Sequence, residues 1–506
     1  MKQINFDAMM NKFTITRLAM SLAMALQIPA SLSCGGHRVP DLSKVFSEAR
    51  EQTGKRPIII VPGILSTTLV NSKTRETVWP SAFRSEVDDL NLPITGDPLN
   101  SRDNLISTRA IESTRFLPLT PRVNILGDLL ESLRAHAGYQ EGNWENPAPD
   151  GDRDTFYTFV YDWRRDNVQI AQQLVERIGL LKSKLNKPEL RFNVIAISMG
   201  GLIARYAAMY GAAELPAADE APVVTWGGAA HIETILMFGV PNEGSTEAFA
   251  TVLNGYSITE GANKPRRLFH KLSREDAFTG MSVFQLMPHR QTARFLDQDL
   301  RPLKIDLYDP ANWKLYGWSI AHDPKFRKRF EKRNTLGETT GGESAALVLE
   351  AHLSAILERT RLFHRALDAP LEGPSPVPLL AFAGDCEETL NAPVVYFDNK
   401  KNSWVTVTAP RDLRGSDGRR INRDEVMRAM YVPGDGRVTR ASVLGKNISG
   451  ANPQLADLRP LPIVHSFFAC GGHGTLHNNR VLQDNALSVL VRTIVRPPGR
   501  EKTPGM

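Results

Sequence analysis

Short apolar runs, each followed by a stretch with helical periodicity, alternate along much of this chain. The apolar runs predict buried strands, and they cover 56–61, 155–163, 194–197, 232–240, 377–385 and 461–469. Runs that are apolar on both faces are typical of parallel strands covered by helices on both sides.

Apolar side chains recur at helical spacing between these runs and predict amphipathic helices. The stripes begin at Ile170, Leu202, Leu349 and Leu482. Strands that alternate with such helices indicate an α/β fold built on a mostly parallel, doubly wound sheet. The segments PVVYFDN and SWVTVTA, between 393 and 409, predict a β-hairpin or meander.

The alternation of strands and helices stops between 246 and 376. This interval is mixed in character and predicts a cap inserted into the sheet. Its Trp313 and Trp318 suit an acyl groove, a membrane face or the cap's own core. The sheet domain is then expected in two parts, 56–245 and 377–496. The Pro- and Gly-rich tail 497–506 is expected to be disordered.

The sequence FNVIAISMGG, 192–201, carries the most specific chemical signal. A buried strand ends at Ser198, the small residues Ala196 and Gly200 stand two positions away on either side, and a helix follows. A strand, a sharp turn with Ser at its apex and a helix form the nucleophile elbow of α/β-hydrolases. We therefore predict an α/β-hydrolase fold with Ser198 as nucleophile. The alternative is an ordinary strand-to-helix turn with an N-capping Ser.

A serine nucleophile needs a base and an acid, which follow it in this fold in the order Asp or Glu, then His. The predicted base is His473, in a Gly-rich loop after the last strand, with His477 as its rival. His465 lies inside the apolar strand and is expected to be packed in the core. The predicted acid is Asp435, in a Gly-flanked turn, with Asp385 as its rival.

Two backbone N–H groups are expected to bind the oxyanion. Met199 directly follows the nucleophile, and Ile64 lies in the loop after the first strand, with Leu65 as the alternative. We predict no cofactor and no metal, because the chain has neither Cys pairs nor an H-E-x-x-H motif and its His residues are scattered.

Further segments occur in an order that resembles the lecithin:cholesterol acyltransferase family of α/β-hydrolases. Besides the opening strand, the elbow and the final His loop, they are TVWP, FVYDWRRD, FGVPNEGS, FQLMP and VPGDGRVTRAS. The resemblance implies a serine lipid hydrolase or acyltransferase in which Ser198, Asp435 and His473 are catalytic. Two positions depart from the family pattern: Ile197 stands where it often has His, and Arg437 stands where its GDG block has Thr.

Two charged segments each allow two interpretations. In YDWRRD, Arg164 and Arg165 suit ion pairs that fix a strand end beside a packed Trp163, while Trp163 also suits the wall of an acyl groove. The run from Lys325 to Arg333 suits a solvated basic face or a contact with anionic lipid head groups.

The N-terminus, 1–33, predicts a signal peptide: basic residues precede an apolar run at 18–28, and small residues follow it. Ser31 to Cys34 resembles a bacterial lipobox, so Cys34 is a candidate for lipidation. We expect export to the bacterial periplasm or outer surface. Cys386 and Cys470 each follow a predicted core strand, where either a disulfide or two free buried thiols fit.

The net charge of +6 over 506 residues is too weak to indicate a nucleic-acid partner. The expected partner is a lipid or membrane surface. The main prediction is cleavage of phospholipid acyl esters through an acyl-enzyme, which water or an alcohol then resolves. The alternatives are an esterase or amidase on another acyl substrate, or a catalytically inactive, lipid-binding surface lipoprotein.

Overall fold

The computed structural model describes residues 50–81, 90–114, 122–257, 271–335, 344–445 and 461–491. All of them belong to one unit, Ala49–Met506. The predicted signal peptide, Cys34 and the tail 497–506 lie outside these residues. Within the described part, no helix has the length and apolar character that a membrane span requires.

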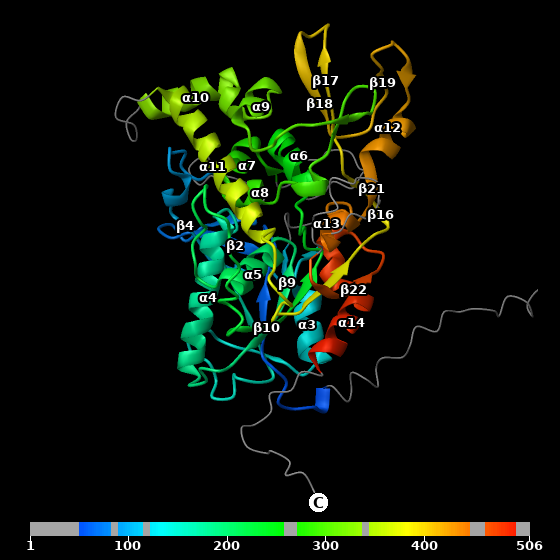
Figure 1. Cartoon of the computed structure of the whole chain (residues 1–506). Coiled ribbons are helices and arrows are strands. Elements are labelled where there is room, and N and C mark those ends of the chain that lie inside the picture. The colour runs from blue at the N-terminus through cyan, green and yellow to red at the C-terminus, as the bar shows by residue number, and fades with distance from the viewer. Residues whose placement is uncertain are drawn as a thin grey trace, which may run out of the picture. The chain divides into compact units, whose positions relative to one another are not determined.

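A seven-stranded sheet forms the centre of this unit (Figure 1), in the order β22-β15-β10-β9-β1-β8-β7. Every pairing in it is parallel, which confirms the predicted α/β sheet. The four strands β1, β9, β10 and β15 are almost wholly buried, as their continuous apolar sequences require. The strands are β1 (Ile58–Val61), β7 (Gln140–Glu141), β8 (Thr155–Thr158), β9 (Phe192–Ile197), β10 (Ile232–Phe238), β15 (Leu379–Ala383) and β22 (Ile463–Phe468).

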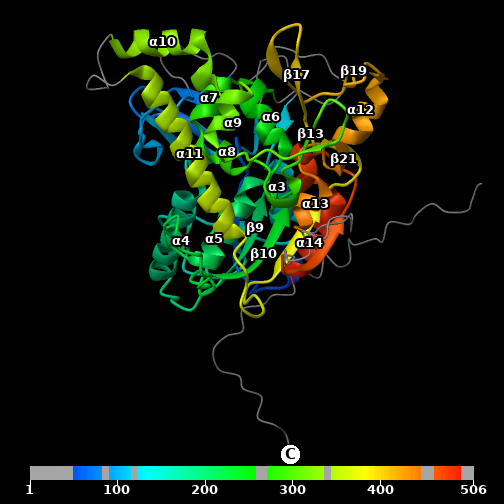
Figure 2. The ribbon, with the colours of Figure 1, turned by 45° about the horizontal axis from the view of Figure 1, so that its top comes forward.

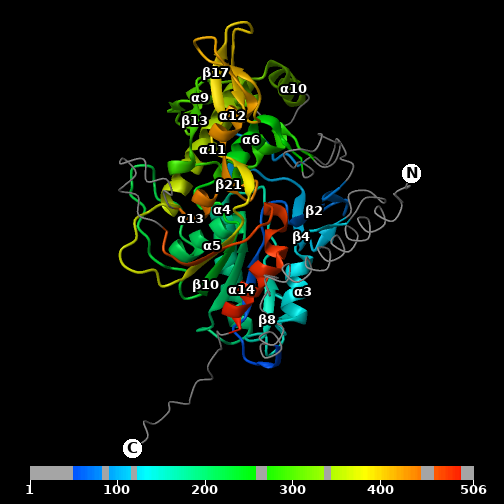
Figure 3. The ribbon, with the colours of Figure 1, turned by 90° about the vertical axis from the view of Figure 1, so that its right-hand side faces the viewer.

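Helices cover both faces of the sheet. The pair α4 (Asn167–Lys184) and α5 (Met199–Tyr210) pack on each other, as do α3 (Gly127–Ala135) and α14 (Arg480–Leu490). Figure 3 shows the two pairs on opposite sides of the strands. The predicted apolar stripe of α4, which begins at Ile170, is buried.

Small antiparallel sheets follow the first strand. One contains β2 (Thr67–Asn71), β3 (Thr77–Trp79) and β4 (Leu105–Ala110), and β5 (Ser113–Thr114) pairs with β6 (Val123–Asn124). A 3-10 turn, η1 (Pro98–Asn100), precedes β4.

The chain between β10 and β15 forms the layer predicted as a cap. Figures 1 and 2 show its helices gathered beyond one end of the sheet. Its elements are α6 (Thr246–Asn254), β11 (Tyr256–Ser257), β12 (Lys271–Leu272), α7 (Arg274–Thr279), α8 (Met281–Gln285), η2 (Arg290–Thr292), β13 (Phe295–Leu296), β14 (Pro302–Leu303), α9 (Pro310–Leu315), η3 (Ile320–His322), α10 (Pro324–Thr335) and α11 (Ala345–Leu367).

Aromatic side chains fill the core of this layer. Trp313 and Trp318 are 0% and 1% exposed and pack with Phe249, Phe284 and Phe295. A position at a membrane face is therefore wrong for these two Trp side chains. They fill the cap's own core, where their indole N–H groups have hydrogen-bond partners. The indole N–H of Trp313, for example, donates to the carbonyl of Leu307.

The segment after β15 contributes to the same layer. The predicted hairpin is confirmed as β17 (Val394–Asp398) and β18 (Ser403–Val407), and β17 pairs in parallel with β13. The covering layer is thus built from two separate stretches of chain. The remaining elements are β16 (Glu387–Leu390), β19 (Leu413–Arg414), β20 (Arg420–Ile421), α12 (Arg423–Met430), β21 (Tyr431–Gly434), α13 (Arg440–Leu444) and η5 (His473–Asn478).

The YDWRRD segment is structural in this fold. The buried Arg164 guanidinium pairs with Asp162 at 2.7 Å and with Asp103 at 2.6 Å. Opposite charge beside it holds the pKa of the Asp162 carboxyl below its usual range, against the raising effect of burial. Trp163 is 2% exposed and packs edge-on against Trp79. The segment therefore ties the end of β8 to the loop before β4.

Candidate active site

The predicted elbow is present: β9 ends at Ile197, Ser198 forms the turn, and α5 begins at Met199. Ser198 has φ 51° and ψ −123°, and a positive φ is one that non-glycine residues rarely adopt. The helix passes so close to β1 that a Cβ on Gly200 would lie 2.2 Å from the carbonyl oxygen of Val61. This contact explains why glycine stands two residues after the serine.

The side chains of Ser198, His473 and Asp435 form a hydrogen-bonded chain. His473 Nε2 lies 2.9 Å from Ser198 Oγ, and His473 Nδ1 lies 2.8 Å from Asp435 Oδ2. The Asp435 side chain is fully buried, whereas that of His473 is 15% exposed. In this arrangement Nδ1–H donates to the carboxylate, which leaves Nε2 to accept the serine proton. The structure thus brings together the three residues that the sequence analysis singled out.

The turn around Asp435 fixes its carboxylate. Oδ1 accepts hydrogen bonds from the N–H groups of Arg437 at 3.0 Å and Val438 at 2.8 Å. The main-chain carbonyl of Asp435 accepts from the N–H group of His473 at 2.8 Å. Because the second oxygen faces the imidazole, side chain and main chain both join the acid loop to the base loop.

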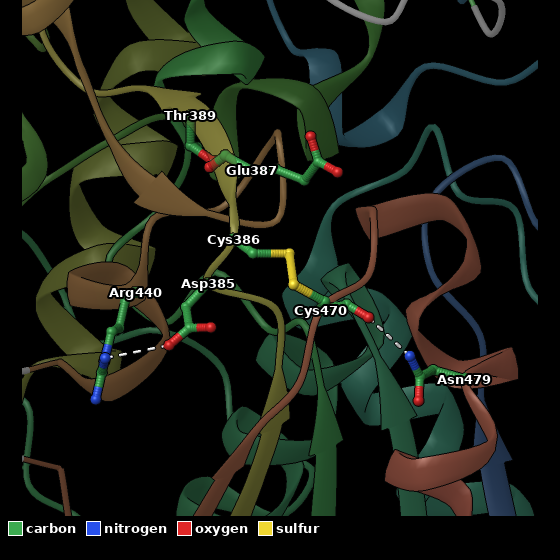
Figure 4. The surroundings of a disulfide bond; sticks show 7 residues. All are labelled: Asp385, Cys386, Glu387, Thr389, Arg440, Cys470 and Asn479. Atoms are coloured by element: carbon green, nitrogen blue, oxygen red, sulfur yellow. Dashed lines mark hydrogen bonds and ion pairs between the residues drawn. A yellow bond between two sulfur atoms is a disulfide. The ribbon is translucent and has the colours of Figure 1, made fainter. Parts of the chain in front are cut away.

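The rival acid and base residues lie in other environments. Asp385 pairs with Arg440 at 3.1 Å (Figure 4). His477 is buried and its Nε2 contacts the carbonyl of Ile125, and burial lowers its pKa to about 4. The expectation that His465 is packed in the core is wrong, since it is exposed on β22. β22 is an edge strand of the seven-stranded sheet, so packing covers it less than the central strands.

The loop after β1 brings Ile64 and Leu65 to the elbow. A Cβ on Gly63, the residue before them, would lie 3.1 Å from the Cβ of Ser198. Neither the Ile64 N–H group nor that of Met199 donates a hydrogen bond to another described residue. The Ile64 side chain packs against the aromatic cluster of the cap layer, so this loop joins the elbow to that layer.

Two further residues support the site: Trp79 of TVWP and Gly239 of FGVPNEGS, whose roles these segments did not indicate. The Trp79 indole donates to the carbonyl of Leu65 at 2.9 Å and so holds the loop after β1. Gly239, with φ +56°, lies where a Cβ would come within 3.2 Å of Asp435 Oδ2 and 3.3 Å of His473 Cε1. The Phe-Gly-Val sequence at the end of a buried strand was the available signal for Gly239; its partners are distant in the chain.

A disulfide joins the ends of β15 and β22 (Figure 4). Cys386 and Cys470 are bonded, with their Cα atoms 5.3 Å apart, so the disulfide interpretation holds over free thiols. Cys470 lies three residues before His473. Cys386 leads into β16, which pairs with β21 and so with the strand that ends at Gly434, directly before the acid.

Access to the nucleophile is restricted, because Ser198 is only 9% exposed. A cavity of about 630 Å³ lies elsewhere and is lined partly by β4 and by 141–145. None of Ser198, His473 and Asp435 lines it. Among the described residues, no three His, Cys, Asp or Glu side chains group in a way that suits a metal ion. Ser198, His473 and Asp435 supply a nucleophile, a base and an acid.

The parallel sheet, the elbow after a central strand and the acid and base on later strand ends define an α/β-hydrolase fold. No family model and no curated protein matches the chain. Among solved structures, "The crystal structure of Tle4-Tli4 complex" matches with a TM-score of 0.49 and 13% sequence identity, covering 87% of this chain and 99% of that chain. A likeness at this level carries no argument about activity.

Proposed function

We propose that this protein is a serine-dependent lipid ester hydrolase or O-acyltransferase that acts on phospholipid acyl esters. The observation that supports it most is the hydrogen-bonded chain from Ser198 Oγ through His473 to Asp435. The lipid substrate rests on the resemblance to the lecithin:cholesterol acyltransferase family. We also propose that the chain is exported, on the basis of its N-terminal sequence.

The first half-reaction forms an acyl-enzyme. Ser198 Oγ attacks the ester carbonyl while His473 Nε2 removes its proton, at the 2.9 Å separation. The buried Asp435 carboxylate orients the ring and stabilises the imidazolium that forms. The tetrahedral oxyanion accepts hydrogen bonds from the N–H groups of Met199 and Ile64. The imidazolium then protonates the leaving alcohol, and the acyl group remains on Ser198.

The second half-reaction decides between hydrolysis and transfer. A water or an acceptor alcohol gives its proton to His473 and attacks the acyl-enzyme, which releases fatty acid or a new ester and restores Ser198. Both outcomes use the same protein groups, so the acceptor distinguishes them.

A lipid needs an opening in the layer that covers Ser198. We propose that part of 246–280 acts as a lid. This segment is the first part of the cap layer in the chain, and the aromatic cluster of that layer contacts Ile64 in the loop beside Ser198. Residues 258–270 of this segment lie outside the described residues.

A fluorophosphonate probe tests the nucleophile. The wild-type protein should be labelled, Ser198→Ala should not, and Ser466→Ala on the exposed part of β22 should be labelled like the wild type. An unlabelled, folded wild-type protein would favour the lipid-binding alternative. Labelled phosphatidylcholine, with and without a sterol or diacylglycerol, then separates fatty acid from new ester. Failure to turn over any phospholipid, with short-chain esters cleaved, would point to another acyl substrate.

A further inference from the structure

Helix α10 has two chemically different faces. Phe326 and Phe330 lie one turn apart, stack on each other with centroids 6.2 Å apart, and pack against the aromatic core of the cap layer. Phe326 also meets Phe278 of α7 edge-on at 6.4 Å. This aromatic stripe anchors the helix, so the opposite face is held outward.

The outward face is basic. Lys325, Lys328 and Lys332 recur at a spacing of three and four residues, which places them along one side of the helix, and all three are exposed. The helix carries six Lys or Arg residues and one Glu.

Ion pairs flank this lysine stripe. Arg327 pairs with Glu350 of α11 at 3.1 Å, and Arg329 pairs with Glu275 of α7. These contacts direct the carboxylates of Glu350 and Glu275 toward the flanking arginines. Because the helix carries six basic residues against one Glu and its three stripe lysines are exposed, this face has a net positive charge.

Exposed leucines occur on the two helices next to α10 in the chain. Leu315, at the end of α9, is 54% exposed and follows the exposed Lys314. Leu347, in the first turn of α11, is 61% exposed. Helix α11 packs against both α9 and α10. Surfaces that lie in a membrane interface combine basic residues with exposed large apolar side chains.

The position of α10 suits such a contact. Figures 1, 2 and 3 all show α10 on the side of the cap layer that faces away from the seven-stranded sheet. The carboxyl end of β9, which leads to Ser198, points toward the cap layer in Figure 1. A bilayer at α10 would thus meet the part of the molecule that covers the nucleophile.

We propose that the lysine stripe of α10, together with the exposed Leu315 of α9 and Leu347 of α11, docks the protein on an anionic phospholipid bilayer. This docking surface deepens the proposed function and rests on it for its biological purpose. The lysines are attracted to an anionic bilayer over about one Debye length. The leucine side chains can insert into the apolar part of the bilayer surface. Zwitterionic bilayers offer the insertion without the attraction.

Vesicle binding tests the docking surface in a Ser198→Ala background, which prevents lipid turnover during the measurement. The test variant carries K325E, K328E and K332E. The matched control carries K73E, R122E and R480E, three exposed basic residues outside the cap layer, and has the same net charge. Circular dichroism and thermal melting check that both variants fold. Dissociation constants are measured on phosphatidylglycerol-containing and on pure phosphatidylcholine vesicles at several salt concentrations.

The stripe variant should bind phosphatidylglycerol vesicles on the order of 100-fold more weakly than the parent, and the control within about threefold of it. Parent binding should weaken as salt rises. With Ser198 restored, the stripe variant should cleave a soluble short-chain ester like the wild type. Loss of vesicle binding equal in control and stripe variants, or equal affinity for both vesicle types, would overturn the proposal.

Two further outcomes separate related hypotheses. Equally tight binding of duplex DNA, lost in the same stripe variant, would identify a general polyanion surface and overturn lipid docking. Stripe-dependent vesicle binding by a protein without any esterase activity would leave the docking surface standing and refute the proposed function.

Discussion

Removal of the disulfide between Cys386 and Cys470 should lower the stability of the folded protein by an amount that follows from the length of the loop it closes. The double variant Cys386→Ser, Cys470→Ser opens a covalent loop with a sequence separation of 84 residues. In the chain-entropy model, a closed loop of that length lowers the free energy of the folded state relative to the unfolded state by ~4.5 kcal/mol at 25 °C. This is a large share of the roughly 5–15 kcal/mol that stabilises a typical domain.

The folded state of this variant should keep most contacts around the bond. The His473 N–H group still donates to the main-chain carbonyl of Asp435. The Asn479 amide donates to the main-chain carbonyl of Cys470, and a side-chain substitution leaves that carbonyl in place. Strands β16 and β21 also remain paired. We therefore expect a folded enzyme with a much lower unfolding midpoint, and activity that declines at lower temperature than in the wild type.

Urea unfolding of the double variant and of the wild type, each with and without dithiothreitol, measures the difference. The reductant should destabilise the wild type toward the variant and leave the variant unchanged. A loss below about 1 kcal/mol, with thiol titration showing that the wild-type bond was intact, would refute the loop-entropy reasoning.

Further predictions concern the acid, the base loop and the lid. Asp435→Asn should lower kcat about 10⁴-fold by stabilising the wrong His tautomer, while Asp385→Asn should leave it within a few-fold; equal losses in steady-state assays would contradict the acid assignment. Gly239→Ala should lower kcat at least tenfold with the fold retained, because its Cβ would crowd the acid and the base; wild-type kinetics would dismiss this crowding. His477 is held neutral in the fold with a pKa of about 4, against 6.5 in the unfolded chain, so the unfolded state gains a proton first as pH falls. Stability should drop by up to ~3 kcal/mol between pH 6.5 and 4, and denaturant titrations of His477→Gln should lack this part of the loss. Phospholipid vesicles should increase amide exchange in part of 246–280; exchange that vesicles leave unchanged would count against the lid.

The elbow could be predicted because adjacent residues specify its strand, turn and helix. The run before Ser198 specifies a buried strand, whereas the contact that requires Gly200 is with the distant strand β1 and became visible only in the structure. The candidate acid and base stood out because their loops carry glycines after strands. Trp79 could not be assigned in this way, since its hydrogen bond to Leu65 depends on how two antiparallel strands fold back.

Features that depend on distant pairing were harder to predict. The burial of β22 was overestimated, because its apolar sequence does not reveal that it is an edge strand and leaves His465 exposed. The positions open to Trp313 and Trp318 could not be separated either, since a buried core and a membrane face both favour aromatic residues. The inclusion of the hairpin in the cap layer depends on the pairing of β13 with β17, whose residues are about 100 positions apart in the chain.

The chain order of the hydrogen-bonded site has a consequence for biosynthesis. His473 lies 275 residues after Ser198, so a ribosome completes the elbow long before the base exists. Every nascent or C-terminally truncated chain that ends before the last strand lacks the group that activates the serine. The bond between Cys386 and Cys470 adds a second requirement, because it forms only under oxidising conditions. The assembled site thus reaches full stability only in a chain that includes His473 and has been oxidised.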